Sequence, residues 1–257
     1  MSPTWVNGEP GGSFALDDAA IWAGMGVFES LRTVKRVVFR LEAHLDRLAQ
    51  SVAWMGWTWD RGAVTRELLN LAAASEHEQK LNVLITAQQR LVAAVPLDLS
   101  RVGAPVRCAT VPLQAVAWLP GFVKHTSRAA WLLAVREASR RLAEPVDEVI
   151  WVDERGCWTE ANRSNLIAVR DGVVHTPPLD GRILEGVTRA FVIEAAVAGR
   201  IPVVEGPVFG AGRWDELYLC STLKDLAPVT RLDGGPAPGS GPVGAEIGLQ
   251  MDRIRSA

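Results

Sequence analysis

The amino-acid sequence predicts an α+β protein made of two α/β domains. The 257 residues are enough for one large core or two modest ones, and 48% hydrophobic and 22% charged residues are typical of a globular protein. Strand and helix patterns alternate in two stretches, and residues 111–122 between them contain prolines and a glycine without clear periodicity. We therefore expect an N-terminal domain over residues 1–112, a connector over 113–122 and a C-terminal domain over 123–257.

The first domain begins with a predicted hairpin. Residues 27–34 and 37–39 have strand composition, and the charged pair Lys35-Arg36 separates them. Apolar residues at 41, 45, 48 and 52 then recur at helical spacing and predict a helix that packs on the sheet, with Arg47 beside the apolar stripe. Residues 61–75 predict a second amphipathic helix, and a second strand pair is expected at 82–86 and 91–95.

The second domain opens with a predicted helix that ends before Pro145, because proline disfavours helical geometry in the residue before it. Its expected inward face consists of Ala130, Leu133, Ala134, Ala138 and Leu142. A strand is predicted at 149–152, and a hairpin at 166–176, because Asp171-Gly172 supplies the positive φ angles of a two-residue turn.

Further elements complete the second domain. A helix is predicted from residue 187 to 198, with Gly199 as its C-terminal cap. Strands are expected at 201–204 and 217–220. The glycine- and proline-rich residues 233–244 predict an exposed loop, and residues 245–254 a closing helix.

Charge and cysteine content limit the possible partners. The net charge of -2, without runs of like charge, argues against a binder of nucleic acid or of an anionic membrane, so a small-molecule partner is expected. No apolar run reaches the roughly 18 to 20 residues that cross a bilayer. Cys108, Cys157 and Cys220 have neither disulfide-framework nor zinc-site spacing. These features predict a cytoplasmic protein without a bound metal.

Lys124 and Glu160 are the residues most informative about chemistry. A lysine can form a Schiff base with an aldehyde cofactor, and a carboxylate beside a pyridine nitrogen keeps that ring protonated. Taken singly, each is more often a solvated surface charge. Together they suggest pyridoxal phosphate chemistry.

Two places could bind a phosphate. Gly186-Val187-Thr188 offers backbone amides at a helix start and a hydroxyl, and Ser221-Thr222 offers two hydroxyls just past a strand. Arg47 could supply a positive charge. Judged alone, either motif is more often an ordinary helix cap or turn, and a lone helical arginine is usually a surface group.

Seven segments together resemble the fold-type IV pyridoxal phosphate enzymes, the class IV aminotransferase family. They occur in the family's order and approximate spacing: residues 24–32 (GMGVFESLR), 44–48 (HLDRL), Lys124, Thr159-Glu160 with 164–166 (SNL), 177–179 (PPL), 186–189 (GVTR) and Ser221-Thr222. The resemblance implies the D-amino-acid aminotransferase-like fold, pyridoxal 5'-phosphate as cofactor and a homodimer.

By position, the resemblance also implies individual roles. Lys124 would bond the cofactor and move the substrate proton, and Glu160 would pair with the pyridine nitrogen. The implied phosphate ligands are Arg47, Val187, Thr188, Thr222 and Ser221. The implied substrate-binding residues are Phe28, Arg32 and Arg128.

Two further residues are interpreted as having no role in the chemistry, and the second departs from the family's pattern. His44 is interpreted as a structural residue near the domain surface. Arg90 is displaced by two or three positions from the arginine that commonly binds a substrate carboxylate in the family, and we interpret it as a hairpin-turn charge. Arg32 or Arg128 would then take over that carboxylate.

The cofactor-binding residues do not discriminate between the reactions of the family. The opening of residues 24–33 and the Lys-His-x-x-Arg pattern of Lys124 to Arg128 resemble lyases that convert 4-amino-4-deoxychorismate to 4-aminobenzoate and pyruvate, a reaction of folate biosynthesis. An aminotransferase acting on branched-chain or D-amino acids is the first alternative. A non-catalytic protein that keeps the fold as a binding module is the second, although intact Lys124 and Glu160 argue against it.

Overall fold

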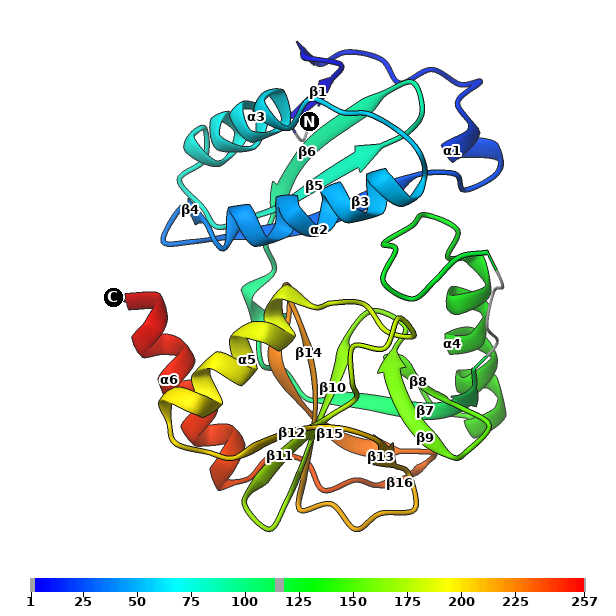
Figure 1. The fold of residues 1–257 in the computed structure, drawn as a ribbon, viewed down its shortest axis with the longest axis vertical. Helices are drawn as coiled ribbons and strands as arrows, with labels where there is room; N and C mark the ends of the chain where they lie inside the picture. The colour runs from blue at the N-terminus through cyan, green and yellow to red at the C-terminus, as the bar shows by residue number, and fades with distance from the viewer. Residues whose placement is uncertain (1–2, 114–117, 257) are drawn as a thin grey trace. The chain divides into compact units, whose positions relative to one another are not determined.

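The computed structural model describes residues 3–113 and 118–256, which form two compact units (Figure 1). The first comprises residues up to Leu99 together with Val123–Arg128, and the second comprises Ser100–Phe122 and the remainder from Ala129. This division differs from the expected domains at both ends of the connector, of which residues 114–117 lie outside the described residues. The lysine expected in the C-terminal domain therefore groups with the N-terminal unit.

Backbone pairing explains the difference. The strand β7 (Val106–Pro112) is parallel to β8 (Glu148–Val152) and to β15 (Asp225–Leu232), so it belongs to the second sheet. The segment around Lys124, by contrast, pairs with the first sheet. The Phe28 amide donates to the Lys124 carbonyl at 2.9 Å, and Val27 forms an isolated β-bridge with His125. The segment Val123–Arg128 is thus held by the first unit.

The first unit is a sheet against which its two longer helices pack (Figure 1). Its strands follow the order β2-β1-β6-β5-β3-β4 within the described residues. In chain order the elements are β1 (Thr4–Val6), β2 (Glu9–Pro10), α1 (Ala19–Trp22), β3 (Val27–Val34), β4 (Val37–Val38), α2 (Leu41–Trp54), α3 (Arg61–Ala73), β5 (Gln79–Ile85) and β6 (Arg90–Pro96).

The predictions for the first unit are confirmed. β3 and β4 form the hairpin, and both turn residues, Lys35 and Arg36, have positive φ. α2 buries Leu45, Leu48 and Val52 against the sheet, as its apolar spacing predicted. β5 and β6 pair antiparallel; β5 begins three residues before its predicted strand and ends one residue before the predicted end, and β6 is one residue longer than predicted at each end.

The second unit contains a closed ring of strands. After the short 3-10 helix Leu99–Arg101 come β7, α4 (Ala129–Leu142), β8, β9 (Cys157–Ala161), β10 (Asn165–Arg170), β11 (Val173–Thr176), α5 (Val187–Ala198), β12 (Val203–Glu205), β13 (Val208–Phe209), β14 (Glu216–Ser221), β15, β16 (Gly235–Pro236) and α6 (Pro242–Ser256). Strands pair in the order β10-β14-β15-β7-β8-β9, and β9 pairs back with β10. The sheet therefore closes into a barrel.

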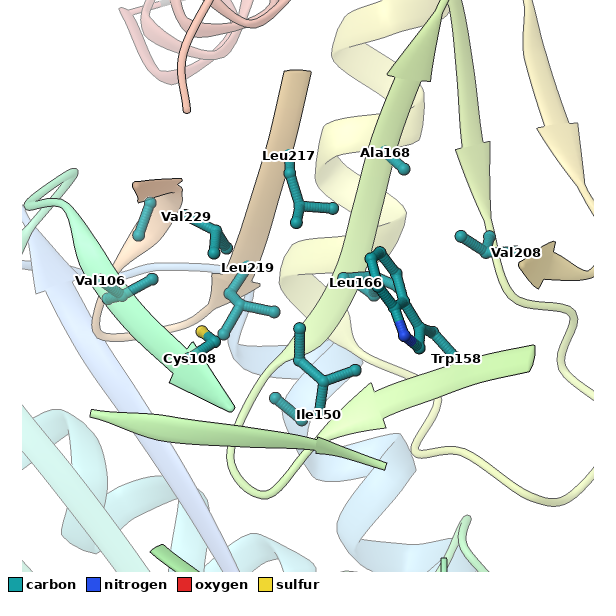
Figure 2. Packing of buried hydrophobic residues seen from close by; sticks show 12 residues of the cluster. Val106, Cys108, Ile150, Trp158, Leu166, Ala168, Val208, Leu217, Leu219 and Val229 are labelled. Carbon is teal, nitrogen blue, oxygen red and sulfur yellow. The ribbon is translucent and has the colours of Figure 1, made fainter. Parts of the chain in front are cut away.

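Apolar side chains from these strands pack together as the core of the second unit (Figure 2). Leu166 and Leu219 are fully buried there, and Trp158 is 5% exposed. The strands β7, β9 and β15 line this core, but the sequence patterns did not predict them. β15 carries Pro228 opposite Tyr218, and proline normally demotes a strand prediction.

The helices of the second unit are confirmed, with two corrections. The inward face of α4 consists of Trp131, Ala134, Val135, Ala138 and Leu142. Leu133 is instead 59% exposed and Ala130 is also exposed, because the bulkier Trp131 packs inward against Trp151. α6 begins three residues earlier than predicted, and β16 lies within the predicted loop. Among the described residues, no helix combines the length and apolarity needed to cross a bilayer.

Candidate active site

The first unit brings together Lys124, Phe28 and Arg128. The Lys124 Nζ lies 4.9 Å from the centroid of the Phe28 ring, and the Arg128 guanidinium carbon lies 5.4 Å from the same centroid. The Lys124 backbone amide donates to the Ser51 hydroxyl at 3.1 Å. An amine and a guanidinium are therefore held beside one aromatic ring by cation–π contacts and backbone bonds.

The turn after Lys124 is fixed by Gly24. The hydroxyls of Thr126 and Ser127 each donate to the Gly24 carbonyl at 2.7 Å. Gly24 has φ +63°, and a β-carbon there would lie 2.9 Å from the Ser127 hydroxyl. Glycine is required by both conformation and space. The family-like opening at residues 24–32 thus anchors the lysine segment.

Positive charge dominates this segment. Burial, reinforced by the charges of Arg128 and Lys124, lowers the pKa of His125 to about 4. His125 is therefore neutral at physiological pH, while Lys124 and Arg128 give the segment a local excess of positive charge. Such a site favours a substrate that carries a carboxylate.

Arg47 lies in a buried network in the same unit. Its Nε and Nη2 donate to the Glu29 carboxylate at 2.6 and 2.8 Å, and His44 Nδ1 lies 3.0 Å from Glu29 Oε2. Burial opposes ionisation of Glu29, but the Arg47 charge and the His44 hydrogen bond outweigh it and hold the Glu29 pKa below its usual range. His44 is only 1% exposed, so it is a hydrogen-bonded residue of the interior rather than one near the surface.

Two other arginines lie on strands of the first sheet. Arg32 lies four positions beyond Phe28 on β3, roughly 13 Å along the strand. Its side chain is buried. Arg90 begins β6 and its Nη2 lies 2.8 Å from the Glu67 carboxylate, so it forms an ion pair inside the first unit.

The second unit brings Glu160 against the start of α5. Asn165 pairs with Glu160 across β10 and β9 and with Cys220 across β10 and β14. The Glu160 Oε2 accepts hydrogen bonds from Asn165 Nδ2 and from the Leu184 amide, each at 3.1 Å. These donors fix the carboxylate. The sequence did not predict that Asn165 and Leu184 hold Glu160. The Leu184 donor is a backbone amide 24 residues from Glu160, which no side-chain motif reveals.

The predicted phosphate motifs converge at the same end of the barrel. Gly186 is the N-cap of α5 and offers no capping side chain, and Val187 and Thr188 begin the helix, each 8% exposed. Ser221 ends β14 next to Cys220, the residue paired with Asn165, and Thr222 follows it. First-turn amides and the helix dipole favour an anion here, and the hydroxyls add further donors.

A buried ion pair lies directly after these hydroxyls. Lys224 pairs with the fully buried Glu148, whose carboxylate also accepts from the Ser164 hydroxyl at 2.9 Å and from the Arg163 amide at 3.2 Å. This pair fastens the turn after Thr222 to the segment that precedes Asn165.

The sequence-predicted site residues thus form two groups. Lys124, Phe28 and Arg128 meet in the first unit, which also contains Arg47 and Arg32. The second group lies in the second unit and consists of Glu160, Val187, Thr188, Ser221 and Thr222.

Comparison with known proteins gives consistent matches. The model of the family described as amino-transferase class IV matches residues 26–232. A putative branched-chain-amino-acid aminotransferase of Methanocaldococcus jannaschii is 29% identical over 240 residues, covering 84% of this chain and 82% of the relative. A D-alanine aminotransferase of Listeria monocytogenes is 26% identical over 241 residues, covering 85% and 82%. A branched-chain aminotransferase structure from Thermoproteus uzoniensis with norvaline has a TM-score of 0.87 at 25% identity, covering 99% of this chain and 95% of that one.

Proposed function

Because the chain belongs to the class IV aminotransferase family, whose enzymes use pyridoxal phosphate, we propose that it transfers the amino group of a branched-chain or D-amino acid to a 2-oxo acid. The observation that carries the proposal is the placement of Lys124 and Arg128 on one Phe28 ring. One side chain can exchange a proton with an amino acid, and the other can bind its carboxylate.

The donor set fits the cofactor. Pyridoxal phosphate presents an aldehyde, a ring nitrogen and a phosphate, and the chain offers an amine at Lys124, a fixed carboxylate at Glu160 and an uncapped helix start at Gly186. A β-carbon on Gly186 would overlap the Asn165 side chain, so the helix start and the carboxylate are packed together without spare room. When bound, the cofactor supplies an electron sink for the substrate carbanion.

Each residue then has a proposed task. The Lys124 Nζ moves the substrate proton, and Glu160 keeps the ring nitrogen protonated, because a nearby opposite charge favours the charged form. The phosphate is bound by the Val187 and Thr188 amides, by the hydroxyls of Thr188, Thr222 and Ser221, and by the Arg47 charge. Arg128 binds the substrate carboxylate, and the Phe28 ring restricts the size of the substrate side chain.

A lyase acting on 4-amino-4-deoxychorismate is the second candidate. The Lys-His-x-x-Arg pattern favours it, because Arg128 is held beside the reactive amine and could bind a ring carboxylate. The relatives named above are aminotransferases, which is why transamination is proposed first.

Purified protein loaded with pyridoxal phosphate tests both candidates. Incubation with L-leucine or D-alanine alone should convert the cofactor spectrum to that of its amine form. Glutamate should form only when 2-oxoglutarate is also present, because the acceptor takes up the amino group and returns the cofactor to its aldehyde form. Release of 4-aminobenzoate from 4-amino-4-deoxychorismate without an acceptor, with no transamination of either amino acid, would replace the first candidate by the second.

The lysine assignment needs its own control. Lys124→Ala should lose the visible absorption band of the bound cofactor and its activity, whereas Lys35→Gln, in the exposed β3–β4 turn, should keep both. A Lys124→Ala protein that retained band and turnover would refute the assignment.

We also propose that the enzyme is a cytoplasmic homodimer. The family resemblance supports the dimer, and the three cysteines are free thiols in the structure, which suits a reducing compartment. Light scattering on a sizing column checks the oligomeric state.

A further inference from the structure

Arg189 is a buried cation that the proposed chemistry does not use. It belongs to the first turn of α5, and its side chain is 3% exposed. Its Nε donates to the Thr176 hydroxyl at 3.1 Å. Its Nη2 donates to the Pro177 carbonyl at 2.9 Å and to the Glu205 carboxylate at 2.6 Å. The guanidinium thus connects the start of α5 to the ends of β11 and β12.

The Thr176 hydroxyl links Arg189 to a third strand. β11 and β12 are parallel, and Thr176 lies opposite Glu205 where both strands end. Thr176 is fully buried, and its hydroxyl donates to the Leu166 carbonyl on β10 at 2.8 Å. Because arginine nitrogens only donate hydrogen bonds, the hydroxyl accepts from Arg189 and directs its own proton to Leu166. The first turn of α5 is therefore tied to β10 through a chain of hydrogen bonds with a fixed direction.

The stability of α5 gives no reason for a cation at this position. The amides at a helix start carry partial positive charge, so a first turn favours acidic residues and disfavours arginine. The first turn of α5, which the structure describes in full, contains no acidic residue, and Phe191 and Val192 already bury the apolar face of the helix. Glu205 is 48% exposed, so water screens its attraction to Arg189. An anion bound at this turn would offset the buried positive charge.

The charge of Arg189 lies near both phosphate motifs. Arg189 directly follows Thr188 in the first motif. Burial raises the pKa of the Cys220 thiol to about 12, and the Arg189 charge acts against that rise, so the charge reaches the end of β14. Cys220 directly precedes Ser221, the first residue of the second motif.

We propose that Arg189 is a positioning residue for the cofactor phosphate. Its hydrogen bonds hold the first turn of α5 in the orientation in which the Val187 and Thr188 amides bind the phosphate, and its charge favours an anion there. The inference rests on the proposed function and on the phosphate role of this turn within it. All of these groups belong to the second unit. Arg189 acts through the turn, and no contact with the cofactor is assigned to it.

Substitution Arg189→Met tests the proposal, because methionine keeps an apolar stem but has neither the charge nor the donors. Apoprotein titrated with pyridoxal phosphate, followed by the visible band and by tryptophan fluorescence, should bind about 10- to 100-fold more weakly. This is the loss typical when a partner that orients a metal ligand is removed. Pyridoxal, which lacks the phosphate, should bind as it does to the wild-type protein.

Arg189→Lys separates geometry from charge. Lysine keeps the positive charge, but its single nitrogen cannot reproduce the two-nitrogen geometry of the guanidinium. This variant should also bind pyridoxal phosphate more weakly than the wild type, although less so than Arg189→Met. Wild-type affinity in Arg189→Lys would overturn the positioning role.

The chain offers a matched control in Arg231→Met. Arg231 also donates to a carboxylate, that of Glu144, and to a backbone carbonyl, that of Gly234. It lies six positions along β15 from Asp225, the residue opposite Ser221, and so roughly 20 Å along the strand from the proposed phosphate site. This variant should lower the unfolding temperature and leave the affinity for both aldehydes unchanged.

The outcomes separate the proposals. If Arg189→Met binds pyridoxal phosphate like the wild type, weakens pyridoxal to the same extent, or behaves like Arg231→Met, Arg189 has only a structural role and the inference is overturned. If wild-type apoprotein binds neither aldehyde, the proposed function fails and this inference fails with it.

A second variant applies should Arg189→Met not fold. Thr176→Val keeps the shape of the side chain and removes the acceptor of the Arg189 Nε bond. The same selective loss for the phosphorylated aldehyde is expected, and equal effects on pyridoxal phosphate and pyridoxal would overturn the inference.

Discussion

The Asn165 side chain occupies the space that a β-carbon on residue 186 would need. Gly186 has φ −69°, an ordinary value, so its glycine is required by contact rather than by backbone conformation. Asn165 also donates to Glu160 Oε2 at 3.1 Å and to the Leu184 carbonyl at 2.9 Å. One side chain thus fixes both the carboxylate and the entry to the helix.

Gly186→Ala should therefore weaken cofactor binding. The added methyl displaces either Asn165 or the start of α5, at a stability cost of about 1–3 kcal/mol for overpacking. Pyridoxal phosphate titration and thermal unfolding measure the two effects. Gly248→Ala, in α6 with no neighbour within 4 Å of the new atom, should bind the cofactor normally and be stabilised by about 0.5–1 kcal/mol. Normal cofactor affinity in Gly186→Ala would show that this contact is dispensable.

Arg128→Gln should raise the KM for the amino donor and leave kcat nearly unchanged. A charge-assisted hydrogen bond to a carboxylate contributes about 1.5–3 kcal/mol, which corresponds to roughly 10- to 150-fold in KM. Steady-state kinetics with both substrates varied provide the measurement. Arg136→Gln, at an exposed position on α4, serves as the control. An unchanged KM would transfer the carboxylate-binding role to Arg32.

His125 should contribute to loss of stability on acidification. Its pKa is lowered from 6.5 to about 4 in the folded chain, so between these values the unfolded chain binds more protons and stability rises with pH. The contribution is fully present above pH 6.5 and declines as pH falls toward 4, with a slope of at most about 1.4 kcal/mol per pH unit. Urea unfolding of His125→Asn at pH 5 and pH 7 should show a smaller difference between the two pH values than the wild type. His77→Asn, at an exposed position, should retain the wild-type difference, and an unchanged difference in His125→Asn would rule out this contribution.

Lys224→Met should strongly destabilise the second unit. Removing the ammonium leaves Glu148 buried without its ion-pair partner, a situation that typically costs about 3–5 kcal/mol. The double variant with Glu148→Gln should recover part of the loss. Arg107→Met removes a half-exposed pair with Asp147 and should cost less than about 1 kcal/mol. Equal costs for Lys224→Met and Arg107→Met in denaturant unfolding would contradict the expectation.

Local signals were sufficient for much of the fold. The hairpin over residues 166–176 was predictable because Asp171 and Gly172 both adopt positive φ, which few residue pairs do readily. The helix stripe of Leu45 and Leu48 likewise follows from spacing alone. Closure of the barrel was not predictable, because it needs the pairings of β7 with β15 and of β10 with β14, which are distant in sequence and which no local pattern specifies.

The candidate site likewise contains residues that the sequence predicts and residues that it does not. Lys124, Arg47 and Glu160 could be named from residue type and family-like spacing. The groups that orient two of them could not, because Glu29 reaches Arg47 only through packing of α2 on β3, and the Leu184 amide reaches Glu160 through a loop. The Arg128 contact with Phe28 was also not predictable, because the segment that contains Arg128 follows the connector in the sequence and yet pairs with β3.

Because the barrel is closed, the position of Glu160 depends on the folding of the whole second unit. The pairing of Asn165 with Glu160 is the seam where β9 and β10 complete the ring. Strands in a closed ring have no free edge from which to fray, so this seam opens only when the surrounding strands separate as well. Amide exchange at Glu160 and Asn165 is therefore expected at the rate of global unfolding, and a destabilised barrel should lose its cofactor in a single cooperative event rather than by gradual loosening.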